Sequence, residues 1–207
     1  MKRWSVCLLV LALTGCGSGK KVVPAGPAPT PAKDAVPWPV PADPMKVTRQ
    51  AGLTPETHEF LFLHVHAHLD VFVNGKPLVV PAGIGIDIDN PAVHRSKESD
   101  GSMGYGGITT PCAAPCISPL HTHHADGILH TEAKENQPNT LGEFFTEWGV
   151  RLDSRCVGGY CKPTAPFTIY VHGDPSSGDP RQIKLEDRTE IALVIGTPPA
   201  VIPSRFG

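Results

Sequence analysis

Residues 60–73 read FLFLHVHAHLDVFV, and the alternation of side-chain polarity in this stretch is the clearest indication of the fold. Every odd-numbered position from 61 to 73 is apolar, whereas the even-numbered positions include three histidines and an aspartate. Because successive side chains of a β-strand point to opposite faces, this alternation predicts a strand with one face in the core. The other face then carries a row of polar side chains, His64, His66, His68 and Asp70.

The residues that follow this strand predict an α+β domain. Asn74-Gly75 is a strong signal for a hairpin turn. Thr140 and Glu143 have the spacing of a capping box and predict a short helix that ends near Gly149. Two more strands are predicted at residues 167–173 and 190–195. A hairpin, a helix and two strands in this order resemble the β-grasp arrangement. We therefore expect a mainly antiparallel sheet with one short helix and a β-grasp-like core, with a β-sandwich as the alternative.

A second group of histidines follows a long loop. Residues 87–120 are rich in Gly, Pro and Ser and show little periodicity, and loops of this length in compact domains are usually functional. The loop leads into residues 120–130, LHTHHADGILH, which contain His121, His123, His124, Asp126 and His130. Seven of the ten histidines of the chain therefore fall in two short segments.

The spacing of these histidines predicts a metal site. Two histidines at i and i+2 on a strand project to the same face with Cβ atoms about 7 Å apart, so both imidazoles can reach one ion. This arrangement occurs twice in the chain, and solvated surface histidines are the alternative. The predicted ligands are His64, His66, His68, His121, His123 and His130, while Asp70, His124 and Asp126 are candidates to orient a ligand imidazole or to join the site.

Ligand chemistry narrows the metal to zinc or copper, bound at one site. Imidazole suits both ions, and neither Met45 nor Met103 lies in a histidine cluster, which argues against a Met-rich Cu(I) carrier. The formal net charge of −2, from 18 Lys+Arg against 20 Asp+Glu, removes the electrostatic basis for nucleic-acid binding. The sequence contains no P-loop, dinucleotide fingerprint or Gly-x-Ser-x-Gly motif, so nucleotide and serine-hydrolase functions are not expected.

The first 45 residues predict export and a tether. A basic start is followed by an apolar run at residues 4–13 that is too short to span a bilayer but fits a signal peptide. The segment from Leu13 to Cys16 resembles the lipobox of bacterial lipoproteins, whose cysteine is lipidated, and an ordinary secretory signal is the alternative. We expect a signal peptide at residues 1–15, lipidated Cys16 with a Pro/Ala-rich tether at 16–45, and one His-rich domain at 46–207. The protein would then be lipid-anchored in the bacterial cell envelope, at the outer membrane or the cell surface.

The remaining cysteines predict two disulfides. Of the six cysteines, Cys7 leaves with the signal peptide and Cys16 takes the lipid. Four cysteines in an oxidising compartment allow three connectivities. The local pairs are the simplest of these, and a Cys-ligated metal site is the rival, although neither spacing is Cys-x-x-Cys. The two local pairs are Cys112–Cys116 and Cys156–Cys161.

Several segments resemble a family of exported bacterial His-rich proteins of uncharacterised function. They are HVHAHLDVFVNG, VPAGIGID, PLHTHHADGILH, TLGEFFTEWGV and EIALVIGTPP, and the resemblance covers most of residues 60–200. The second cluster of the family pattern reads His-Thr-His-Asp, whereas this chain has His124 at the last of these positions. If that position is a ligand, this chain is expected to prefer a different metal from the family or to bind none. The resemblance implies no established activity and leaves the function open.

Three classes of function fit this sequence, and we expect the first. It is an envelope lipoprotein that binds zinc or copper for buffering, sensing or delivery, with the membrane and the ion as its partners. The second is a metal-dependent hydrolase or hydratase, for which Asp70, Asp126 and Glu132 are candidate general bases. The third is an envelope assembly or interaction module without metal, whose protein partner the sequence does not name.

Overall fold

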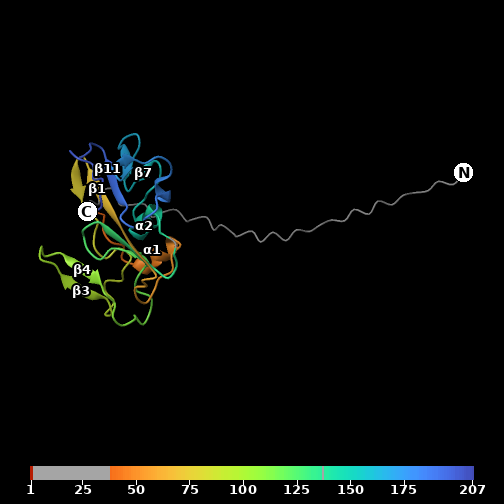
Figure 1. Ribbon diagram of the computed structural model, residues 1–207, viewed down its shortest axis with the longest axis vertical. Helices are drawn as coiled ribbons and strands as arrows, with labels where there is room; N and C mark the ends of the chain where they lie inside the picture. Colours follow the sequence, from red (N-terminus) through yellow and green to blue (C-terminus); the bar gives the residue numbers. More distant parts are fainter. Residues whose placement is uncertain (2–37, 137) are drawn as a thin grey trace.

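The long strand predicted at the start of the fold is the centre of the sheet. The computed structural model describes residue 1 and residues 38–136 and 138–207, and strand β1 spans Leu63–Val73 (Figure 1). Ala67, Leu69 and Val71 are buried, so the predicted alternation holds. The strand begins three residues later than residue 60, because Leu63 pairs with Ala133, the last residue of the neighbouring strand. Residues 60–62 therefore have no partner there to extend the strand.

The chain forms one main sheet whose first and last strands are parallel neighbours. The strand order is β10–β9–β11–β1–β6–β5, with β2 also paired to β1. β1 is parallel to β11 and antiparallel to β2 and β6. The bounds of the other strands of this sheet are Lys76–Leu78 (β2), Leu120–His121 (β5), Ile128–Ala133 (β6), Phe167–Val171 (β9), Asp174–Pro175 (β10) and Glu190–Ile195 (β11).

The topology confirms the predicted α+β class. The order β2–β1–β11–β9, with the helix after the hairpin in the chain and a parallel central pair, agrees with a β-grasp-like core. The sheet is mainly antiparallel, as predicted, and β1–β11 is the one parallel pair among its described strands. Because these strands join one sheet, the described residues do not form the β-sandwich of the alternative prediction.

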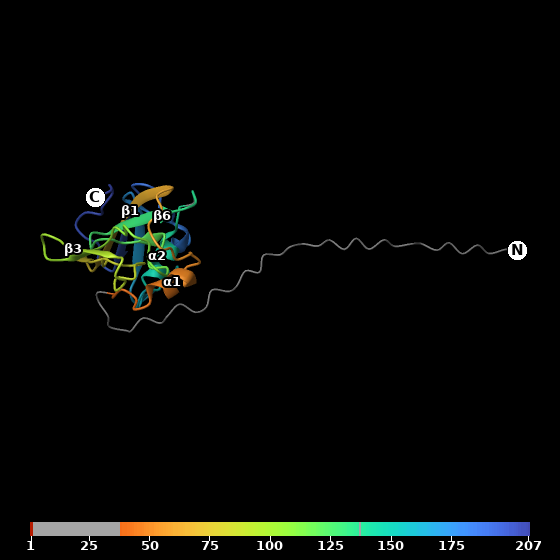
Figure 2. The same ribbon diagram turned by 90° about the horizontal axis from the view of Figure 1, so that it is seen from below.

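Two helices, rather than the single predicted one, lie on the same side of β1 and β6 (Figure 2). Helix α2 (Leu141–Glu147) begins with the predicted capping box, in which Thr140 and Glu143 satisfy each other's backbone amides. Helix α1 (Pro44–Gln50) begins where the Pro-rich segment ends. Its N-cap is Asp43, whose side chain accepts a hydrogen bond from the amide of Lys46. A short 3₁₀ helix, η1, spans Pro180–Gln182. None of the helices in the described part of the chain is long and apolar enough to cross a membrane.

The core lies between the helices and the apolar face of the sheet. Phe144 and Phe145 of α2 and Trp148 at its C-cap are fully buried there. Trp38 is only 5% exposed and packs edge-on against Trp148, with ring centroids 5.3 Å apart. The fold therefore takes in residues that precede the predicted domain start at 46. The predicted signal peptide, apart from residue 1, and the predicted lipidation at Cys16 lie outside the described residues.

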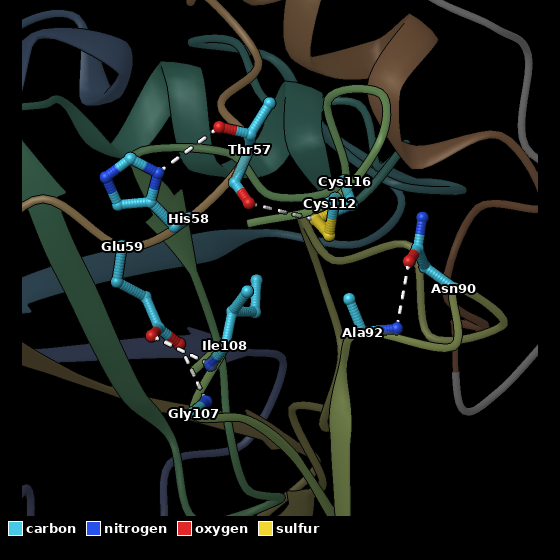
Figure 3. The surroundings of a disulfide bond; sticks show 9 residues. All are labelled: Thr57, His58, Glu59, Asn90, Ala92, Gly107, Ile108, Cys112 and Cys116. Carbon is cyan, nitrogen blue, oxygen red and sulfur yellow. Dashed lines mark hydrogen bonds between the residues drawn. A yellow bond between two sulfur atoms is a disulfide. The ribbon is translucent and has the colours of Figure 1, made fainter. Parts of the chain in front are cut away.

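The segment predicted as a long loop contains a hairpin and one of the disulfides. Strands β3 (His94–Lys97) and β4 (Met103–Gly106) pair with each other and extend away from the main sheet (Figure 1). The disulfide Cys112–Cys116 lies beside the carbonyl of Thr57 (Figure 3) and anchors the end of this segment. The amide of Cys112 donates to the same carbonyl at 2.9 Å. Glu59 reinforces the attachment by accepting hydrogen bonds from the amides of Gly107 and Ile108.

Both predicted disulfides are confirmed. The second, Cys156–Cys161, joins the short strands β7 (Cys156–Val157) and β8 (Tyr160–Cys161). Each bridge closes a loop of only a few residues, as the local pairing predicts. With these four cysteines paired, thiolate ligands do not contribute to a metal site in the described residues.

Candidate metal centre

Three neighbouring strands bring the two histidine clusters onto one face of the sheet. Strand β6 lies between β1 and β5, and His130 is the register partner of His66 on one side and of His121 on the other. Glu132 is opposite His64. Since residues at the same level of neighbouring strands share a face, five histidines and one glutamate come together.

An inner group consists of His121, His123, His130 and Glu132, whose ligand atoms all lie within 4.8 Å of one another. The Nε2 atoms of His121 and His123 are 3.2 Å apart. Oε1 of Glu132 lies 3.7 Å from Nε2 of His123 and 3.5 Å from Nδ1 of His130. The group is largely shielded from water, and His121 is completely buried. It has the ligand types and the convergence of a site that can hold a metal ion.

Hydrogen bonds at the far edge of each ring fix how His121 and His123 face the site. Nδ1 of His121 donates to the carbonyl of Ser118 at 2.8 Å, and Nδ1 of His123 donates to the carbonyl of Tyr105 at 2.6 Å. Because a carbonyl oxygen can only accept, both Nδ1 atoms carry hydrogen. In the neutral rings, both Nε2 atoms therefore point lone pairs into the group, as metal-bound histidines do.

This orientation leaves two lone pairs facing each other across 3.2 Å. Such a contact is repulsive unless a proton or another cation lies between the two nitrogens. Two ligand atoms of one tetrahedral ion with bonds of about 2.0–2.1 Å lie about 3.3–3.4 Å apart. The separation of the two Nε2 atoms thus matches one edge of a tetrahedral coordination shell.

Neighbouring charges and burial set the protonation of the inner group. Burial, followed by the nearby His123, lowers the pKa of His121 to about 3, so this ring is neutral at pH 7. Burial lowers the pKa of His130 as well. For Glu132, burial acts upward, but His123 and His130 outweigh it and hold the pKa of the carboxyl well below its usual value. Burial acts downward on His123, yet Glu132 and the Tyr105 carbonyl together raise the pKa of that ring.

His130 contributes a buried atom without a protein partner. Its Nδ1 is buried and forms no hydrogen bond within the described part of the chain. A buried nitrogen left in this state costs free energy, since it has lost its water without replacement. An ion bound beside Glu132 would satisfy this atom.

The backbone around the inner group is shaped to receive the two rings. Gly106 has φ +134° and lies so close to His123 that an added Cβ would overlap Nδ1 and Cε1 of the imidazole. On the other side, Ser118 is held by Glu147, whose Oε1 accepts from the serine hydroxyl at 2.6 Å. Glu147 is itself buried and also accepts from Thr48 of α1 at 2.9 Å. Burial raises the pKa of Glu147 to about 8, so its carboxyl is mostly protonated at pH 7.

An outer group consists of His64, His66 and His130. Nε2 of His64 and Nε2 of His66 are 3.1 Å apart, close to the spacing of the inner pair. Burial and then the neighbouring His130 lower the pKa of His66. The side chain of His64 is 41% exposed, so this group is open to solvent where the inner one is closed.

The structure separates His68 from these two groups, although the sequence places it in the same row. Its Nδ1 lies 2.9 Å from Oε2 of Glu190 on the parallel strand β11, and its Nε2 lies 3.0 Å from the carbonyl of Asp126. The hydrogen bond to Glu190 raises the pKa of His68 against the opposing effect of burial. His68, Asp70 and Glu190 form a third group of possible ligands, but both ring nitrogens of His68 already face acceptors.

The side chains considered as orienting groups have other partners. Asp126 accepts a hydrogen bond from the amide of Ile128 and contacts His68 through its backbone only. His124 faces Glu98, with Nδ1 3.6 Å from the carboxylate, and belongs to none of the three groups. Burial raises the pKa of Asp70, whose carboxylate lies 3.8 Å from His68.

Glu132 and Glu190 are the site residues that the sequence did not identify as ligands. Glu132 follows His130 at i+2, the same spacing that identified the histidine pairs, so the pattern could have found it if carboxylates had been counted. Glu190 is completely buried in a strand of otherwise apolar residues. Its proximity to His68 depends on the parallel pairing of β1 and β11, which no local pattern reveals.

A pocket of about 260 Å³ adjoins the centre at His123. It is lined by residues of β3 and β4 together with His123 and His124. Its walls include Tyr105 and Gly106, which contact the Nδ1 edge of His123. The inner group and the pocket therefore share His123.

Comparison of the chain with protein-family models, with curated proteins and with solved structures gave no match. The resemblance to exported bacterial His-rich proteins accordingly stays a prediction, and the functional argument rests on the site itself.

Proposed function

We propose that this protein binds a transition metal ion, zinc or copper, through the inner group, and that it buffers, senses or delivers this ion in the bacterial cell envelope. The observation that carries the proposal is the pair of Nε2 atoms of His121 and His123. Their Nδ1 atoms are committed to carbonyl oxygens, so both Nε2 atoms point into the group 3.2 Å apart and need either a shared proton or a metal ion between them.

The proposed ion has three imidazoles and one carboxylate as ligands, a combination that suits zinc. The distances within the group are 3.2 Å between the two Nε2 atoms, 3.5 Å from His130 to Glu132 and 3.7 Å from His123 to Glu132, and the first two are close to the edges of a tetrahedron. Neighbouring ligands in a square plane, which Cu(II) favours, would lie about 2.8–3.0 Å apart at bonds of about 2.0–2.1 Å. The geometry therefore favours zinc over Cu(II).

Binding is better supported than catalysis. Glu132 is the carboxylate nearest the histidines, and its lowered pKa makes it a good ligand but a weak general base. Convergence of buried rings also speaks against a surface row of histidines that serves only assembly.

The proposed location in the envelope rests on the sequence from Leu13 to Cys16 and on the two disulfides, which are typical of oxidising compartments. Replacing Cys16→Ser in a bacterial host tests the lipid anchor. We expect the full chain to fractionate with membranes and to incorporate labelled fatty acid, and the variant to do neither. An equal membrane fraction for both proteins would contradict anchoring at Cys16.

Metal content tests the main proposal directly. The full chain is purified without chelator, stripped with EDTA, reloaded with Zn²⁺ or Cu²⁺ and analysed for metal after exhaustive dialysis. We expect at least one tightly held ion per chain. The double variant His121→Ala/His123→Ala should lose this ion, whereas the matched control His58→Ala/His94→Ala, which removes two histidines outside the three groups, should keep it. A folded full chain that holds no metal after reloading would overturn the proposal.

A further inference from the structure

The two pairs of histidines are too far apart to serve one ion. All ligands of a single zinc ion lie within about 4.2 Å of one another, twice the length of a Zn–N bond. Within the described residues, no set of possible ligand atoms that are all within 4.8 Å of one another includes members of both pairs. The possible ligand atoms of His64 and His66 converge with His130, whereas those of His121 and His123 converge with His130 and Glu132.

Each pair nevertheless has the spacing of two ligands on one ion. The Nε2 atoms of His64 and His66 on β1 are 3.1 Å apart, and those of His121 and His123 at the end of β5 are 3.2 Å apart. Strand β6 runs between the two and places Glu132 within reach of both. Its Oε1 lies 3.3 Å from Nε2 of His64 and 3.7 Å from Nε2 of His123, and its Oε2 lies 4.0 Å from Nε2 of His121.

We propose that the cluster is a dinuclear centre, with an inner ion on His121, His123 and His130, an outer ion on His64 and His66, and the Glu132 carboxylate between them. The inference rests on the proposed function, because it adds a second ion to the first. A carboxylate whose Oε1 lies within 4 Å of a nitrogen from each pair is placed as a bridging ligand.

The surrounding charges support the outer position. Two divalent ions close together repel each other, so a dinuclear centre needs negative charge near both. Glu132 provides it between them, and Asp187 adds a carboxylate beside the outer pair, since its Oδ1 accepts a hydrogen bond from the amide of His66 at 3.3 Å. The remaining coordination positions of the outer ion face solvent.

The two ions differ in accessibility. The inner ligand His121 is completely buried, whereas the side chain of His64 is 41% exposed. The outer ion has fewer protein ligands and contact with water, so it binds more weakly and exchanges faster. This arrangement suits a protein that takes up or transfers one ion while retaining another.

Zinc titration of the full chain, followed by isothermal calorimetry and by metal analysis at saturation, tests the inference. We expect two Zn²⁺ per chain in two steps, with the weaker step absent from His64→Ala/His66→Ala and one tight ion retained. The control His58→Ala/His94→Ala should still bind two ions. Circular dichroism and thermal melting of the metal-free proteins establish that each variant is folded.

The outcomes separate the two proposals. A single Zn²⁺ per wild-type chain at saturation would overturn the dinuclear centre and leave the proposed metal-binding function standing. Two ions in His64→Ala/His66→Ala would also overturn it, since the second ion would then lie elsewhere. No bound ion in any of the folded proteins would remove the proposed function, and the dinuclear centre with it.

Discussion

His66 and His68 are two residues apart on one strand and point to the same face, yet their surroundings differ completely. His66 lies beside His64 and His130, among other nitrogens, and burial and these rings lower its pKa. His68 lies between Glu190 and the Asp126 carbonyl, which raise its pKa. The comparison shows that a row of identical side chains is divided by its neighbouring strands. Strand β6 presents His130 to His66 but Ile128 to His68, and β11 presents Glu190 to His68, so His66 meets another possible ligand and His68 meets a counter-charge.

The largest effect expected from this comparison is the loss of the inner ion on removal of its carboxylate. We predict that Glu132→Gln weakens zinc binding at least about 100-fold, because the inner group loses its only negatively charged ligand. A competition titration against a chelator of known affinity measures the change. Glu135→Gln, three residues further on, is the matched control and should bind zinc like the wild type.

The next effect concerns stability rather than metal. We predict that His68→Ala retains the full metal content but lowers the free energy of unfolding by about 3 kcal/mol, since it leaves Glu190 buried without its partner. Urea denaturation monitored by circular dichroism gives the stability, and metal analysis gives the content. Loss of metal from this variant would show that His68 belongs to the metal centre after all.

A smaller effect is expected from the backbone beneath the inner pair. Gly106→Ala places a methyl group against the His123 ring and turns it away from the Tyr105 carbonyl. Changes to groups that orient a ligand typically reduce metal affinity about 10–100-fold, and we predict a loss in this range. Gly101→Ala is a suitable control, because Gly101 also has positive φ and an added Cβ there meets nothing within 4 Å. Equal affinity of the two variants would contradict this role of Gly106.

The smallest effect is the dependence on pH. The pKa of His123 is raised, so in the metal-free protein this ring holds a proton at and somewhat above its ordinary titration range, and zinc must displace it. Affinity should therefore fall as the pH falls through this pKa, by up to about tenfold per unit for one displaced proton. Proton release measured by calorimetry in buffers of different ionisation enthalpy checks the number. An affinity independent of pH between 6 and 8 would contradict the proton competition.

The features that depend on local sequence could be predicted. The alternation along β1, the turn at Asn74-Gly75 and the capping box at Thr140 each depend on residues a few positions apart, and each appears in the structure. The two disulfides follow for the same reason. Helix α1 was not predicted, because the segment before it is rich in proline. Asp43-Pro44 is nevertheless a recognisable helix start.

The features that depend on distant strands could not be predicted. The register of β6 against β1 decides that His130 and Glu132 join the histidine pairs, and the parallel position of β11 decides that His68 meets Glu190. Neither register follows from the spacing of residues within one strand. The sequence therefore located the face that carries the site but did not divide its histidines into ligands and an ion-paired residue.

The buried carboxyl of Glu147 connects helix α1 to the backbone that orients His121. Its two oxygens accept from Thr48 and from Ser118, and the carbonyl of Ser118 in turn holds the imidazole. If the chain is anchored at Cys16, a pull on the N-terminus reaches the domain first at Trp38 and α1. Thr48, Glu147 and Ser118 then form a mechanical linkage of side chains from the point of tension to a metal ligand. In an envelope protein with this linkage, tension along the tether would rotate the imidazole of His121 slightly and so change the affinity of the site for its ion.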